Sequence, residues 1–275
     1  MSKKNGVMLL FLFIPLLATY FLSQRQVAAF RADYSYRLHA NMSRLPDIVV
    51  EILAGEFKGL VADYLLLDAA AFIGSSQSLE TSSDEDWNAV ARLLEQSSRL
   101  DPCFRNTYIL TQGALPWRAH KYHETIKILA RSKQHLSWDW IPGFFIGFDS
   151  YFFLKDNLTA SQELMEASKI EGAPFTLATL ASRLASQAGR TRAAIEFLSA
   201  VYENTEDQDA KNVIQVRIQA LQGVQALQIA VGTFQIQFGR KPDTLDELVE
   251  KGVLPHLPVN PYNKPYSYVD GKIDF

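Results

Sequence analysis

The sequence predicts an all-α protein whose main part is a solenoid of helical hairpins, followed by a small C-terminal helix and β-hairpin. The first supporting observation is a repeat: four similarly placed leucines lie 35, 35 and 34 residues apart, namely Leu94, Leu129, Leu164 and Leu198. A period near 34 residues with two helices in each unit is typical of helical-hairpin arrays. The second observation is an uncharged apolar run near the N-terminus. The third is a turn-rich C-terminal segment.

The surroundings of the four leucines agree as well as their spacing does. Small or β-branched side chains stand four residues before and three residues after each leucine, which places them on one helix face and lets a neighbouring helix approach closely. They are Val90, Thr125, Ala160 and Ala194 before the leucines, and Ser97, Ser132, Ala167 and Val201 after them. We expect four hairpins, formed by 57–74 with 84–99, 104–117 with 120–132, 141–155 with 157–169, and 174–188 with 190–202.

Over Phe57–Tyr202 this pattern resembles the tetratricopeptide repeat (TPR) family. The resemblance implies a TPR-like solenoid across residues 57–206 that acts as a scaffold for other proteins. The apolar segment Ile141–Leu154 is too short to span a bilayer and contains Asp149. We therefore interpret it as the central first helix of the solenoid, with its phenylalanines mainly in the core.

Residues 1–29 form a predicted membrane anchor or signal segment. Val7–Leu22 runs sixteen residues without a charge, which is about 24 Å as a helix, slightly short of a ~30 Å hydrocarbon core. An uncleaved anchor through residues 7–22 fits this length better than a signal peptide cleaved after Ala29, because apolar signal regions usually span ~7–15 residues. Lys3 and Lys4 favour a cytoplasmic N-terminus. We expect a single pass through the inner membrane, with the body on the periplasmic side.

Between the anchor and the repeats, residues 30–56 are predicted to be a membrane-proximal helical segment. Pro46 separates helices over 30–44 and 48–55. The following helix, 57–74, has a predicted apolar stripe at the three- and four-residue spacing of one helix face. The stripe comprises Leu60, Val61, Tyr64, Leu65, Asp68 and Phe72. Ser83 is then expected to cap the next helix, whose first turn carries acidic residues near the positive end of the helix dipole.

Residues 207–275 are predicted to form a long helix, a short helix and a β-hairpin. An apolar stripe runs along the helix 207–238, and Gly239 ends it. Thr244 and Glu247 form a predicted capping box for the short helix. Four prolines then interrupt regular structure, and the hairpin signal Asp270-Gly271 lies between two short apolar runs.

This C-terminal piece resembles the globular end of type II secretion pseudopilins. The residues that carry the resemblance are 239–248, which read GRKPDTLDEL, and 258–266, which read PVNPYNKPY. Asn260 and Asn263 stand where that family has Asp and Gly, so no calcium site is expected. Phe11 stands where pilins have Glu. The resemblance implies a link to a secretion or pilus apparatus.

Composition excludes several functions. The formal charge is −3, and beyond residue 29 the chain carries 24 basic and 30 acidic side chains, which argues against nucleic acid as a partner. Cys103 is the only cysteine, so an internal disulfide and a cysteine zinc cluster are excluded. No phosphate-binding loop, dinucleotide fingerprint or nucleophile elbow occurs. His123-Glu124 lacks the second histidine of a zinc-protease motif, because Lys127 stands there.

We therefore expect a membrane-anchored scaffold for protein–protein interaction in the bacterial cell envelope, not an enzyme, without cofactor, metal or small-molecule substrate. A pseudopilin-like structural subunit and an enzyme with scattered carboxylates remain as alternatives. Large aromatic residues, arginine and polar residues on the first helices, or directly before Pro142 in the case of two tryptophans, are the candidate partner contacts. They are Tyr108, Gln112, Trp117, Trp138, Trp140, Asp149, Tyr151 and Arg183.

Overall fold

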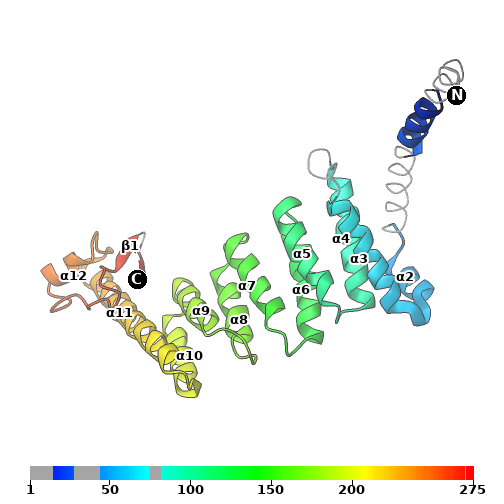
Figure 1. Ribbon diagram of the computed structural model, residues 1–275. Helices are drawn as coiled ribbons and strands as arrows, with labels where there is room; N and C mark the ends of the chain where they lie inside the picture. Colours follow the sequence, from blue (N-terminus) through cyan, green and yellow to red (C-terminus); the bar gives the residue numbers. More distant parts are fainter. Residues whose placement is uncertain (1–14, 28–43, 75–81, 270) are drawn as a thin grey trace, which may run out of the picture. The chain divides into compact units, whose positions relative to one another are not determined.

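The structure is a computed structural model that describes residues 15–27, 44–74, 82–269 and 271–275 (Figure 1). Residues 30–43 of the predicted helix over 30–44, and residues 7–14 of the predicted anchor over 7–22, lie outside these residues. Residues 15–27 are helical. Among the described residues, none of the helices combines the length and apolar character needed to cross a bilayer. The chain divides into two compact units, Met1–Asp101 and Pro102–Phe275, so the division falls inside the predicted repeat block.

Helices dominate the described residues, and the one small sheet among them is at the C-terminal end, as the sequence predicts. The first unit contains α2 (Asp47–Ala54), the short 3₁₀ helix η1 (Gly55–Phe57), α3 (Lys58–Gly74) and α4 (Asp84–Leu100). The predicted cap at Ser83 is confirmed. Its hydroxyl accepts a hydrogen bond from the Asp86 backbone N–H at 3.3 Å, and the Asp86 carboxylate accepts from the Ser83 N–H at 2.8 Å.

The predicted apolar stripe of α3 is wrong in part. Leu65 and Asp68 are buried, but Leu60 and Tyr64 face solvent. The packed side is instead centred on the residues between them, with Ala62, Leu66 and Ala69 all buried. The helix is apolar on nearly every side, so spacing alone could not choose a face. The alanine side allows close approach to α4, where Ser97 Oγ donates a hydrogen bond to the Ala62 carbonyl at 2.9 Å.

In the second unit each helix packs on the next one in sequence, as Figure 1 shows. The pairs are α5 (Arg105–Arg118) with α6 (Tyr122–His135), α7 (Ile141–Phe152) with α8 (Asn157–Ala167), and α9 (Thr176–Gln187) with α10 (Thr191–Asn204). Leu129, Leu164 and Leu198 are fully buried in these pairs, and Leu94 is fully buried on α4 of the first unit, as expected. Gly147 allows α7 to approach α8 closely, because a Cβ at this position would lie 2.7 Å from Leu164 Cγ.

The C-terminal part of the second unit is organised around α11 (Gln208–Phe238), which Asp207 caps and Gly239 ends with φ +71°. Strand β1 (Ser267–Val269) pairs antiparallel with β2 (Lys272–Asp274), so the predicted hairpin forms. Tyr266 docks on α11 against Gly223, where a Cβ would lie 2.0 Å from the tyrosine oxygen. The tyrosine hydroxyl donates to the Ala220 carbonyl at 3.2 Å.

The predicted capping box at Thr244 is wrong, because Thr244 is not the residue that precedes the short helix. The short helix α12 (Asp246–Glu250) begins after Leu245, which makes no side-chain cap. The Glu247 carboxylate accepts a hydrogen bond from the Asp243 backbone N–H at 2.9 Å, and it also pairs with Arg240. The ion pair with Arg240 holds the Glu247 carboxylate near the loop before the helix. There the carboxylate accepts from the Asp243 N–H.

Candidate partner-binding surface

A row of aromatic side chains runs along one side of α7. Trp140, Phe144, Phe148 and Phe152 stand four residues apart, a spacing that places them one above the other on a helix. Their ring centroids lie 6.0, 6.4 and 5.4 Å apart in succession. The first three are half-buried, whereas Phe152 is 44% exposed.

Trp117, at the end of α5, packs beside this row. Its ring centroid lies 6.1 Å from that of Phe148, 5.6 Å from Phe152 and 5.0 Å from Phe153, and the side chain is 49% exposed. Tyr122 at the start of α6 stacks on Phe153 at 4.7 Å. Three helices thus contribute to one continuous set of rings, here called the aromatic surface: Trp117, Tyr122, Trp140, Phe144, Phe148, Phe152 and Phe153.

Positive charge accompanies the aromatic surface. Lys155 Nζ lies 5.4 Å from the centre of the Phe152 ring, and Arg118 follows Trp117 directly. The charged residues of α5 and α7 are Arg105, Arg118 and Asp149, and only the aspartate is buried. Arg105 is paired with Asp139 at 3.1 Å and lies beside Trp138, so the cation in contact with the aromatic surface is Lys155.

Three predicted contact residues cannot touch a partner because they are buried in the core. Tyr108 is fully buried, and its hydroxyl donates to Asp139 Oδ2 at 2.6 Å. Burial and this hydrogen bond raise the pKa of Tyr108 to about 12. Gln112 and Asp149 are buried together between α5 and α7, joined by a hydrogen bond of 2.8 Å. Helical spacing does not distinguish an inner from an outer polar residue, so the sequence could not place them.

Desolvation controls the ionisation of Asp149. Burial raises its pKa from 3.8 to about 6, and only the hydrogen bond from Gln112 acts in the opposite direction. Gln112 Oε1 and Asp149 Oδ2 are buried and accept or donate no hydrogen bond within the described chain. The hydrogen bond between Gln112 and Asp149 joins α5 to α7 in the interior.

The predicted tryptophans Trp138 and Trp140 differ in their surroundings. Trp138 is 61% exposed, and the Arg105 guanidinium lies 5.6 Å from its ring centre. Trp140 is half-buried and belongs to the row on α7. The structure therefore leaves Trp138 accessible but apart from the ring contacts that join Trp117 to α7.

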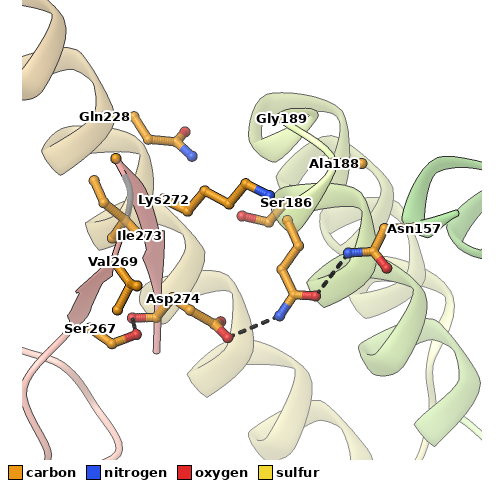
Figure 2. A pocket seen from close by; sticks show the side chains of 12 residues that line it. Asn157, Ser186, Ala188, Gly189, Gln228, Ser267, Val269, Lys272, Ile273 and Asp274 are labelled. Carbon is orange, nitrogen blue, oxygen red and sulfur yellow. Dashed lines mark hydrogen bonds between the residues drawn. The ribbon is translucent and has the colours of Figure 1, made fainter. Parts of the chain in front are cut away.

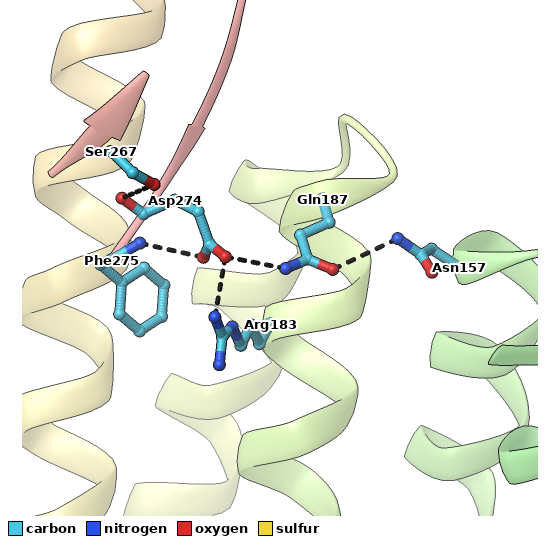
Figure 3. A network of polar contacts seen from close by, with 6 residues as sticks. All are labelled: Asn157, Arg183, Gln187, Ser267, Asp274 and Phe275. Atoms are coloured by element: carbon cyan, nitrogen blue, oxygen red, sulfur yellow. Dashed lines mark hydrogen bonds and ion pairs between the residues drawn. The ribbon is translucent and has the colours of Figure 1, made fainter. Parts of the chain in front are cut away.

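Arg183 and Tyr151, the remaining candidates, do not belong to that row. Tyr151 is partly exposed. Arg183 Nη2 donates to Asp274 Oδ2 at 2.8 Å and so ties α9 to the C-terminal strand (Figure 3). Gln187 donates to the same oxygen at 2.9 Å and accepts from Asn157 on α8 at 3.2 Å. We call the contacts of Asp274 with Arg183 and Gln187 the clasp. Because Arg183 is paired with Asp274, its charge is already engaged by a residue of the same chain. Burial alone would raise the pKa of Asp274, but the bond from Arg183 lowers it.

Beside the clasp lies an open groove of about 700 Å³ (Figure 2). The end of α9, α11 and the hairpin form its walls, with Gln187, Gln228 and Lys272 among the lining residues. Its walls carry amide, hydroxyl and aliphatic groups, the Lys272 amine and the Asp274 carboxylate, without an aromatic ring. Across the residues that the structure describes, no three His, Cys, Asp or Glu side chains gather where they could hold a metal ion.

Sequence reasoning did not select Phe148, Phe152, Phe153 and Tyr122 as surface residues. The four-residue spacing from Trp140 to Phe152 was the available signal, but the same spacing is typical of a buried face. The chain matches no protein-family model, no curated protein sequence and no solved structure.

Proposed function

We propose that the protein is a membrane-anchored, TPR-like scaffold that holds another protein through the aromatic surface. The consecutive packing of helices and the 35-residue leucine period support a hairpin-repeat architecture. The uncharged run at residues 7–22 supports attachment to the inner membrane with the body on the periplasmic side. Its place is the bacterial cell envelope, in the assembly of pilus, secretion or polysaccharide machinery.

The exposure of Trp117 beside Phe152 is the observation that carries this proposal. Large aromatic side chains are enriched among the residues that contribute most to protein–protein binding. Here two of them are about half exposed, and they lie against half-buried rings that hold them in place. The surface is thus a pre-formed apolar contact with a positive edge, the arrangement that an apolar protein segment with acidic neighbours would complement.

Two alternative functions predict different structural features. A pseudopilin-like subunit would bind copies of itself, and its support is the C-terminal resemblance over residues 239–266. An enzyme would need acid–base groups around an enclosed pocket. Asp149 is the described carboxyl group with a strongly raised pKa, and it is paired with Gln112 in a packed interior. The exposed aromatic residues favour the scaffold over both.

Affinity capture from detergent-solubilised membranes tests the proposal. The tagged full-length chain is compared with the double variant Trp117→Ala and Phe152→Ala. Ile236→Ala is the control, because this residue of α11 is also apolar and is 87% exposed. The scaffold predicts a defined partner that the double variant loses and the control retains, with melting temperatures unchanged. Recovery of self-polymers alone would support the pseudopilin-like subunit and contradict the scaffold.

A further inference from the structure

Helix α3 in the first unit has two apolar sides, but only one is packed. The packed side includes Leu65, which is fully buried. On another side Leu60 and Leu67 are 67% and 68% exposed, and Phe57, the last residue of η1 directly before α3, is 70% exposed. A helix that is apolar all round is normally buried on every side. The exposed side of α3 therefore indicates a contact that the described chain does not supply.

The exposed side forms a straight line of large residues. Phe57, Leu60 and Leu67 are separated by three and seven residues, which is the spacing of one helix face. We call these three residues the α3 strip. At 1.5 Å per residue it is about 15 Å long. Soluble proteins rarely expose so many large apolar side chains together unless they bind a partner.

Acidic residues accompany one side of the α3 strip. Glu56 and Asp63 are exposed and stand four residues before Leu60 and Leu67, so each lies beside a strip leucine. Neither makes an ion pair with any residue that the structure describes. The nearest lysine, Lys58, is already paired with Glu51 at 2.8 Å. The strip is thus apolar in its centre and negative at its edge.

We propose that the α3 strip binds an amphipathic helix of another protein whose apolar face is flanked by lysine or arginine. Residues with this spacing form a ridge that fits the groove of a second helix. The flanking cations would pair with Glu56 and Asp63. A second copy of this chain would bring the same carboxylates against each other, and an anionic bilayer would repel them, so charge complementarity favours the cationic helix.

Site-specific photo-crosslinking in intact cells tests this inference. The full chain carries p-benzoylphenylalanine at position 60, or at position 236 as an equally exposed apolar control on α11. We expect a heterologous adduct from position 60 only. Mass spectrometry should place its crosslinked residue in a segment with apolar residues at three- and four-residue spacing and adjacent Lys or Arg.

Charge reversal makes the test specific. Glu56→Lys with Asp63→Lys should lower the yield of that adduct at least tenfold, whereas Glu171→Lys, a reversal of an exposed charge in the other unit, should leave it unchanged. Circular dichroism of each variant checks that the helices are retained. The proposal is overturned by an adduct with a second copy, with lipid or with another part of the same chain. It is also overturned by no adduct, or by a yield that charge reversal does not change.

Discussion

Gln112 Nε2 donates a hydrogen bond of 2.8 Å to Asp149 Oδ1 and so joins α5 to α7 in the interior of the second unit. The same two helices carry Trp117 and Phe152, whose rings lie 5.6 Å apart at the surface. The two helices are therefore joined by a buried polar pair as well as by an exposed aromatic pair. The ionisation of Asp149 affects how firmly the two helices are held together.

Stability should depend on the protonation of Asp149. Its folded pKa, about 6, is above the ordinary 3.8, so the folded protein binds this proton more tightly than the unfolded chain does. The ionised carboxylate opposes folding fully above pH 6, and the opposition disappears as the pH falls toward 4. Asp149→Asn should therefore raise the unfolding free energy at pH 7.5, by at most roughly 3 kcal/mol, with little effect at pH 4.

Urea unfolding between pH 4 and 8 measures this effect. Glu171→Gln is the control, because Glu171 is exposed and makes no ion pair in the described chain. Equal pH dependence of the wild type and Asp149→Asn would show that Asp149 is not the group responsible.

Gly147→Ala should destabilise the second unit because the added methyl group has no room. Its carbon would lie 2.7 Å from Leu164 Cγ and 3.2 Å from the Ala160 carbonyl oxygen, so α7 and α8 would have to separate. We expect a loss of about 1–3 kcal/mol, as for overpacked cores. Gly232→Ala in α11 is the matched control, because no neighbouring atom lies within 4 Å. It should gain roughly 0.5–1 kcal/mol from helix propensity. A stabilised Gly147→Ala in thermal unfolding would contradict the close approach.

The repeated leucines should behave as core residues. Leu129 and Leu164 are 0% and 1% exposed, and removal of their side chains leaves a cavity between adjacent helices. Leu129→Ala and Leu164→Ala should each cost ~2–5 kcal/mol in unfolding free energy. Ile236→Ala should stay within about 0.5 kcal/mol, as expected of a surface site. Similar losses at all three positions would refute the assignment of the leucines.

Asp274→Asn should loosen the C-terminal hairpin without unfolding the helices. The asparagine can still accept the hydrogen bond from Gln187, but it no longer offers a charge to Arg183. We expect faster cleavage after Lys272 by trypsin at low enzyme concentration, with helical circular dichroism unchanged. Asp243→Asn is the control, since this side chain is 91% exposed. Equal cleavage rates in both variants would show that the clasp does not hold the strand.

The sequence predicted the helical hairpins well because two independent signals agreed. The leucine period located each unit, and residues such as Ser83 and Gly239 marked helix ends through their own local chemistry. Local signals of this kind do not depend on which elements meet in three dimensions. The β-hairpin at Asp270-Gly271 was predictable for the same reason.

Residue placement within the helices was less predictable. The buried Asp149 and the exposed Phe152 stand three residues apart on α7, and polarity alone would have exchanged them. The hydrogen bond from Gln112 offsets part of the free-energy cost of burying the Asp149 carboxyl group, and Gln112 is 37 residues away in sequence. In α3 the sequence is apolar on both sides, so only packing on α4 determines which leucines are covered.

Direct binding tests the central claim, that the aromatic surface holds a protein partner. The partner recovered from membranes is purified, and its dissociation constant is measured against the wild type, against Trp117→Ala with Phe152→Ala, and against Ile236→Ala. Each lost hot-spot residue costs about 2 kcal/mol or more, so the double variant should bind about 1,000-fold more weakly while its melting temperature and the control affinity are unchanged. An equal dissociation constant for all three proteins would contradict the scaffold function proposed for this surface.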